Sequence, residues 1–221
     1  MMSKPFIFIH SPKTGGSSVT KFFKYRGDKI HRPASFYMDN FPEEFESHLV
    51  FSITRNPWDR LVSCYFYSCS ASMGGLTPAE HRTAFPTFDS YVQALHENFL
   101  ARGEDLAKPA PHTMFNPINV LSDMTSGGRV IVDYICSMHT LADDFELVRR
   151  MSGIPGELGH DNRSSHRDYR SYYTTRTTEM AATIFQRDID YFGFCFDDLT
   201  TCTFDKVVNQ SKVEAMQARH R

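Results

Sequence analysis

FIFIHSPKTGGSSVTKFF, residues 6–23, defines the first structural unit of the chain. It opens with an apolar run, Phe6–His10, which is typical of a strand buried in a sheet. A turn that contains Lys13 and two glycines follows, and apolar residues then recur at the i, i+3, i+4 spacing of a helix. The stretch predicts a buried strand, a short loop and a helix over Ser17–Arg26 that ends at Gly27.

A second unit of the same kind follows at HLVFSITR, His48–Arg55. This run predicts another buried strand. The next residues, PWDRLVSCYFY (57–67), place apolar side chains on one face of a helix. Pro57 suits the first helical turn, because its missing N–H would have no partner there.

Later segments continue the alternation of strands and helices. We expect a third buried strand over Val130–Cys136, and helices within residues 87–103, 141–153 and 177–194. The polar stretch Ser68–Pro86 is expected to lie on the surface. Strands that alternate with helices predict an α/β fold, with a mainly parallel sheet flanked by helices.

One domain over residues 1–221 accounts for this pattern, with 197–221 as a peripheral C-terminal helix. The net charge of -2 and the lack of a long basic run argue against general nucleic-acid binding. No signal peptide is visible, and no run reaches the ~20 apolar residues of a membrane span. We therefore expect a cytoplasmic protein, and the sequence leaves its oligomeric state open.

The cysteines and histidines show no spacing typical of a metal site. Five cysteines are present, and no C-x-x-C pair occurs among them, so a zinc ribbon or redox motif is unsupported. Cys64, Cys136 and Cys195 stand among apolar residues and are expected to be buried thiols. Reduced cysteines fit a cytosolic protein.

The loop after the first strand has the composition of a phosphate cradle. Gly15 and Gly16 would let the backbone approach an anion closely, and Lys13 would supply a full positive charge. The hydroxyls of Ser17 and Ser18 could cap the helix or bind the anion. An ordinary turn has a similar composition, but lysine and two serines in one turn favour anion binding.

The position of the lysine argues against a nucleoside triphosphate as the bound anion. A nucleoside-triphosphate loop reads G-x-x-x-x-G-K-[ST], with lysine after the last glycine. Here Lys13 precedes both glycines. Asp133, inside VIVDYIC, is a poor candidate for a magnesium ligand. A nucleotide kinase is therefore the weaker alternative.

Arg55 stands at the end of the second predicted strand, where parallel sheets bind their ligands. Its guanidinium could hold one phosphate through two hydrogen bonds, while Lys13 acts as a point charge on another. A ligand with two separated phosphates would bridge the two strand ends. The alternative for Arg55 is a surface salt bridge with Asp59.

SPKTGGSS resembles the 5′-phosphosulfate loop of sulfotransferases that use 3′-phosphoadenosine-5′-phosphosulfate (PAPS), in particular the carbohydrate (Golgi-type) branch and its bacterial relatives. TRNPWDRLVSCY resembles that family's 3′-phosphate signature, and YRSYYTTRTTEMAATIFQRDIDYFGFCF is similar to its closing segment. The resemblance spans about Phe6 to Phe196. It implies a P-loop-like site, with these cofactor-binding residues: Lys13, Thr14, Gly15, Gly16, Ser17, Ser18, Arg55 and Ser63.

The resemblance implies transfer of a sulfuryl group from PAPS to an acceptor hydroxyl, with a carbohydrate or another small molecule as acceptor. In such an in-line displacement the acceptor attacks sulfur, and adenosine 3′,5′-bisphosphate leaves. Lys13 would neutralise the charge on the leaving oxygen, and no metal is needed. The alternative from another class is a non-catalytic nucleotide-binding module on the same fold.

A general base must take the proton of the acceptor. Of the ten histidines, His31 lies between the two phosphate motifs. It is the first candidate, because similar sequences carry a histidine or an acid there. A solvated loop histidine is the alternative for His31, and His112 is the second candidate base. The polar loop 159–173 could close over the nucleotide, grip an acidic acceptor, or lie solvated on the surface.

Overall fold

The computed structural model describes residues 2–3, 5–24, 31–70, 76–103, 119–159, 166–199 and 202–219. These residues fall into two compact units, each assembled from separate stretches of the chain. The first unit comprises Met1–Arg55, Val120–Arg163 and Cys202–Arg221, and the second comprises Asn56–Asn119 and Ser164–Thr201.

The first unit is built on a sheet with the strand order β1-β2-β3-β6. Its strands are β1 (Met2–Ser3), β2 (Phe6–Ile9), β3 (Leu49–Thr54) and β6 (Tyr134–Ser137). The pairs β2–β3 and β3–β6 are parallel, and the short β1 runs antiparallel to β2. Every residue of β2, β3 and β6 is buried, as expected of strands covered on both faces. The predicted mainly parallel sheet is confirmed.

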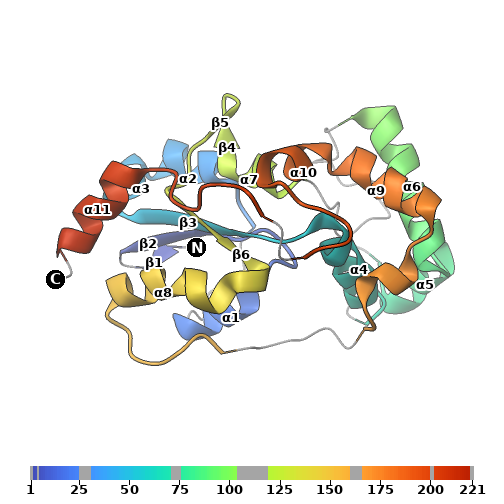
Figure 1. The fold of residues 1–221 in the computed structure, drawn as a ribbon, viewed down its shortest axis with the longest axis horizontal. Coiled ribbons are helices and arrows are strands. Elements are labelled where there is room, and N and C mark those ends of the chain that lie inside the picture. The colour runs from blue at the N-terminus through green and yellow to red at the C-terminus, as the bar shows by residue number, and fades with distance from the viewer. Residues whose placement is uncertain are drawn as a thin grey trace. The chain divides into compact units, whose positions relative to one another are not determined.

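Helices cover both faces of this sheet (Figure 1). On one face lie α1 (Gly16–Phe22) and α8 (Leu141–Ser152), and on the other lie α2 (Ala34–Asn40) and α3 (Pro42–Ser47). Rings fill the core beneath α1 and α8. Phe51 stacks on Phe8 with centroids 4.9 Å apart, and Phe145 of α8 packs edge-on against Phe22 at 5.1 Å. The predicted α/β class is therefore confirmed.

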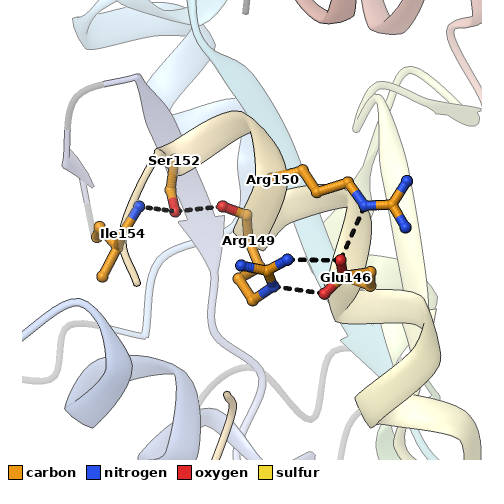
Figure 2. A network of polar contacts seen from close by, with 5 residues as sticks. All are labelled: Glu146, Arg149, Arg150, Ser152 and Ile154. Carbon is orange, nitrogen blue, oxygen red and sulfur yellow. Dashed lines mark hydrogen bonds and ion pairs between the residues drawn. The ribbon is translucent and has the colours of Figure 1, made fainter. Parts of the chain in front are cut away.

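Helix α8 shows how contacts between nearby residues support a helix and end it. Glu146 accepts hydrogen bonds from Arg149 and Arg150, as Figure 2 shows, and these contacts lower its pKa to about 2. The helix ends at Gly153, whose φ of 65° is the left-handed geometry that glycine adopts freely. Ser152 closes the end by donating to the Arg149 carbonyl and accepting from the Ile154 N–H.

The expected strand over Val130–Cys136 is wrong in its first half. Residues 125–130 form a hairpin of β4 (Thr125–Ser126) and β5 (Arg129–Val130), and only β6 joins the main sheet. The carboxylate of Asp133 accepts a hydrogen bond of 2.8 Å from the Val50 N–H, and the Asp133 N–H donates to the Val50 carbonyl. A side chain thus replaces a strand hydrogen bond immediately before β6.

The C-terminal segment completes the first unit. Its helix, α11 (Gln210–Arg219), places Val213 and Met216 in the hydrophobic core, so it is more than a peripheral helix. Two ion pairs hold the segment: Lys206 with Asp144 at 2.5 Å and Lys212 with Asp133 at 2.8 Å. The Lys206 carbonyl also accepts from the N–H of Ile135 in β6. Short elements complete the described part of this unit: α7 (Val120–Met124) and the 3-10 helix η2 (Met138–Thr140).

The described elements of the second unit are helices. They are α4 (Pro57–Ser68), α5 (Pro78–Ala84), α6 (Phe88–Arg102), the 3-10 helix η3 (Tyr169–Tyr172), α9 (Thr175–Ile184) and α10 (Gln186–Phe192). Trp58 joins α4 to α9 and to the residue that follows η3, because its indole N–H donates to the Thr178 carbonyl and its own carbonyl accepts from the Tyr173 hydroxyl.

The single helix expected within residues 177–194 is two helices, α9 and α10. The break follows from Asn119, whose amide donates to the Ile184 carbonyl and whose Oδ1 accepts from the Asp188 N–H. The Ile184 carbonyl and the Asp188 N–H would otherwise bond to each other across one helical turn, and Asn119 binds both of them instead. The helix predicted over residues 87–103 is confirmed as α6.

Two further expectations in the second unit are corrected. The stretch Ser68–Pro86 contains α5, and its His81 and Phe85 are buried rather than solvated. Burial also lowers the pKa of His81. Cys195 is exposed, because its neighbour Phe194 takes the inward position, whereas Cys64 and Cys136 are buried as expected. All five cysteines are free thiols.

Candidate functional site

The loop between β2 and α1 adopts a conformation that its own residues do not favour. Lys13 has a φ of 65° and Gly15 a φ of 90°. A left-handed lysine costs ~1–3 kcal/mol and persists only where surrounding contacts impose it. Left-handed residues in such a loop are also the geometry in which backbone N–H groups converge on an anion.

Side chains inside and outside the loop hold its carbonyl groups. The Thr14 hydroxyl donates to the Ser11 carbonyl at 2.8 Å, and Arg55 donates from Nη1 to the Lys13 carbonyl at 2.9 Å. His31 Nδ1 lies 2.7 Å from the His10 carbonyl. These contacts between protein groups and the loop carbonyls fix the shape of the loop. The Thr14 hydroxyl acts within the loop, so only its backbone N–H remains as the predicted anion contact.

A fourth support joins the loop to α7. The buried Ser11 hydroxyl donates to Asp123 Oδ2 at 2.6 Å, the short distance typical of a hydrogen bond to a carboxylate. Neither residue was predicted from the sequence. The two lie 112 residues apart, and nothing in their local patterns marks the pair.

The two glycines have a packing role in addition to the one expected. A Cβ at Gly16 would lie 1.9 Å from Nε2 of His10, and a Cβ at Gly15 would lie 2.6 Å from Sδ of Met138. Gly15 also needs its positive φ. The glycines therefore leave space for the side chains of His10 and Met138. This packing role is separate from the close approach of an anion to the backbone.

His31, the predicted base, lies beside the loop. It is exposed, and its ring centroid is 4.4 Å from that of His10, which is buried and stacks on Phe8. A carbonyl oxygen can only accept, so Nδ1 of His31 carries the proton in this contact. The neutral ring then has its basic lone pair on Nε2.

Arg55 and Ser63, the predicted 3′-phosphate ligands, belong to different units of the structure. Arg55 follows β3, and its side chain is only 9% exposed. Ser63 is buried in the second turn of α4. The first turn of α4 is capped internally, because Asn56 Oδ1 accepts from the N–H groups of Trp58 and Asp59. Two N–H groups in the first turn of α4 therefore have an acceptor within the protein.

Some candidate residues lie outside the described part of the chain. These are the second candidate base, His112, and residues 160–165 of the loop 159–173. In the described remainder of that loop, Arg170 forms an ion pair with Asp168 at 2.9 Å, and Arg167 lies over the ring of Tyr172 at 5.5 Å. Both arginines thus have partners within the second unit.

Residues 3–194 match the sequence model of the sulfotransferase family. The chain belongs to the sulfotransferase family. This sulfotransferase is a PAPS-dependent enzyme that transfers sulfuryl groups, as the two phosphate motifs predicted. A search of curated proteins and a search of solved structures find no match. The family match ends before the segment that carries α11.

The residues of the loop fit the sulfated end of this donor. The sulfotransferase presents a lysine, a loop with left-handed residues and a nearly buried arginine on neighbouring strand ends, which is a donor set for phosphate oxygens. Among the described residues, no cluster of three or more His, Cys, Asp or Glu is arranged to hold a metal ion. No helix in the described part of the chain is both long and apolar enough to cross a membrane.

Proposed function

We propose that the enzyme transfers the sulfuryl group of PAPS to a carbohydrate hydroxyl by in-line displacement. The observation that carries this proposal is the β2–α1 loop, in which a lysine is held in a left-handed conformation beside a histidine of defined tautomer. The family match supports the sulfuryl chemistry. The carbohydrate acceptor rests on the resemblance of the two motifs to the Golgi-type branch.

Each loop residue has a part in this proposal. The Lys13 ammonium and the N–H groups of residues 14–17 bind the 5′-phosphosulfate, and the hydroxyls of Ser17 and Ser18 add hydrogen bonds, while the Ser18 N–H donates to the Gly15 carbonyl. Arg55 binds the 3′-phosphate, and a second ligand at Ser63 rests on the resemblance alone. PAPS supplies an activated sulfuryl group whose bridging oxygen leaves with the nucleotide.

His31 and Lys13 divide the chemical work. Nε2 of His31 takes the proton from the acceptor hydroxyl as the new O–S bond forms. Lys13 stabilises the negative charge that develops on the bridging oxygen as the old O–S bond breaks. The products are the sulfate ester, adenosine 3′,5′-bisphosphate and a proton held on His31.

The test is turnover of ³⁵S-labelled PAPS against a panel of carbohydrate, phenol, lipid and small-metabolite acceptors. We expect label to move to a carbohydrate, and Lys13→Ala to reduce this transfer strongly. Lys21→Ala is the matched control, because it removes an exposed lysine from α1. Transfer to another acceptor class alone would contradict the carbohydrate assignment, and equal loss in both variants would contradict the role of Lys13.

A further inference from the structure

We propose that Arg55 is a positioning residue for Lys13, through which the 3′-phosphate of the donor sets the geometry of the 5′-phosphosulfate loop. This inference rests on the proposed function, which assigns the 3′-phosphate to Arg55. It goes further, because it makes Arg55 act on both ends of the donor. The enzyme would then select PAPS over a donor without a 3′-phosphate by loop geometry as well as by direct binding.

The contact that carries the inference links two strand ends of the first unit. Arg55 Nη1 donates to the Lys13 carbonyl at 2.9 Å, across 42 residues of sequence. Arg55 is 9% exposed and Lys13 is partly buried, so this hydrogen bond is partly shielded from water. Shielding makes the contact stronger and its loss more costly than at a surface.

The geometry of the peptide bond turns this contact into control of the loop. The peptide unit between Lys13 and Thr14 is planar, with its C=O and N–H pointing in opposite directions. When Arg55 fixes the Lys13 carbonyl on one side, the Thr14 N–H must point to the other. Lys13 itself has a left-handed φ of 65°, so the residue whose carbonyl Arg55 fixes is strained and needs an external support.

The guanidinium group can hold the carbonyl and a phosphate at the same time. Its five N–H donors lie in a rigid planar fork, so a phosphate bound at one edge also fixes the orientation of the other. Binding of the 3′-phosphate would therefore order Arg55 and, through it, Lys13. A glutamine side chain has two N–H donors on one nitrogen and no positive charge, so it cannot replace the charged, rigid fork of arginine between a carbonyl and a phosphate.

Calorimetric titrations with EDTA test this inference. Adenosine 5′-phosphate and adenosine 3′,5′-bisphosphate are titrated into the wild type, Arg55→Gln, Lys13→Ala and the double variant. We expect Arg55→Gln to weaken the 5′-phosphate by about 5- to 20-fold, the size of a lost hydrogen bond, and the bisphosphate by more. In the Lys13→Ala background, the effect of Arg55→Gln on the 5′-phosphate should shrink, because the positioned ammonium is gone.

Two outcomes overturn the inference, and neither of them removes nucleotide binding by the wild type or sulfuryl transfer from PAPS. If Arg55→Gln weakens the bisphosphate and leaves the 5′-phosphate unchanged, Arg55 serves the 3′-phosphate alone. If it weakens both ligands by one factor, its role is structural. Ser11→Ala is the matched control, because it removes the support from Asp123 and should weaken both ligands equally. Failure of the wild type to bind either nucleotide would contradict the proposed function itself.

A measurement on the wild type covers the case in which Arg55→Gln does not fold. Hydrogen exchange is followed in a peptide over residues 11–18 with saturating adenosine 3′-phosphate, a ligand without a 5′-phosphate. We expect exchange in this peptide to slow relative to adenosine. Unchanged exchange with the ligand bound would overturn the inference.

Discussion

The imidazole of His31 holds its Nδ1 proton against the His10 carbonyl, which leaves Nε2 as the basic atom of the neutral ring. This arrangement suits a general base, because the tautomer is set before the acceptor arrives.

His31→Ala is expected to lower kcat by ~10²–10⁴-fold, the usual contribution of a general base, with little change in the Kd of adenosine 3′,5′-bisphosphate. Steady-state kinetics and calorimetric titration measure the two quantities, with His96→Ala on α6 as the control. A His31→Ala enzyme with normal activity would remove His31 from the mechanism, and His112 would be tested next.

The need for glycine at position 16 can be tested by substitution. Gly16→Ala would place a Cβ 1.9 Å from His10 Nε2, so we expect a loss of ~1–3 kcal/mol in the free energy of unfolding. The same substitution in a His10→Ala background should cost less, because the clash is gone. Urea denaturation measures the difference. Equal costs in both backgrounds would show that His10 does not determine the need for glycine.

The sequence predicts the charged residues of the site but not the hydrogen bonds that hold the loop in place. Lys13 and Arg55 follow apolar strands, and that local pattern marks the ligand edge of a parallel sheet. The hydrogen bond of Arg55 to the Lys13 carbonyl and that of Ser11 to Asp123 join residues far apart in the chain. Only the folded backbone brings such partners together, so no local pattern reports them.

Among single helices, α8 has a charged carboxylate, Glu146, that adds a small stabilisation through its contacts with Arg149 and Arg150. The folded pKa of Glu146 is lowered to about 2 by its hydrogen bonds to Arg149 and Arg150. A carboxyl with a depressed folded pKa stabilises the fold above its unfolded pKa and loses this effect as the pH falls through the folded value. The stabilisation is therefore present at neutral pH and lost on approach to pH 2.

Glu146→Gln is accordingly expected to lower Tm slightly at pH 7 and to have a shrinking effect as the pH falls toward about 2. Thermal unfolding at several pH values measures this. Glu179→Gln removes an exposed carboxylate from α9 and is the control. A Glu146→Gln effect that stays constant with pH would mean that the substitution acts through packing or helix propensity.

The C-terminal segment depends on a buried ion pair. Lys212 contacts Asp133 at 2.8 Å, with side chains 15% and 3% exposed. Burial raises the pKa of Asp133, and the hydrogen bond from Lys212 opposes this rise. A raised folded pKa means that the charged carboxylate is costly at neutral pH and that protonation relieves the cost.

Lys212→Met is therefore expected to reduce the free energy of unfolding by ~3–5 kcal/mol at neutral pH, because it leaves a buried carboxylate without its counter-charge. Its cost should be smaller in acid, where Asp133 is protonated. The double variant Lys212→Met with Asp133→Asn should lose less than the single variant. Urea denaturation at two pH values decides this, and a double variant as unstable as the single one would contradict the account.

The sequence predicts elements well where one pattern governs them and less well where a distant side chain intervenes. Strands β2 and β3 and helices α4, α6 and α8 agree with the apolar periodicity. The misplaced start of β6 and the break between α9 and α10 each follow from a side-chain hydrogen bond, made by Asp133 and Asn119. Apolar periodicity does not indicate such hydrogen bonds.

For the whole molecule, the α/β class and the family could be predicted from two short motifs, and the division into units could not. Both units are assembled from stretches that alternate along the chain, and the family match runs through both. Contiguous sequence patterns show no boundary in such a case. The single domain predicted over residues 1–221 stays a prediction.

We infer that the molecule binds a nucleotide with 3′- and 5′-phosphate groups through Lys13 and Arg55, without a metal. Calorimetric titration of the wild type with adenosine 3′,5′-bisphosphate in the presence of EDTA tests it most directly. We expect saturable binding, a rise in Tm because the ligand binds only the folded state, and at least about tenfold weaker binding in Lys13→Ala. Absence of both heat and thermal shift at millimolar nucleotide, or binding that appears only when magnesium replaces EDTA, would contradict the account.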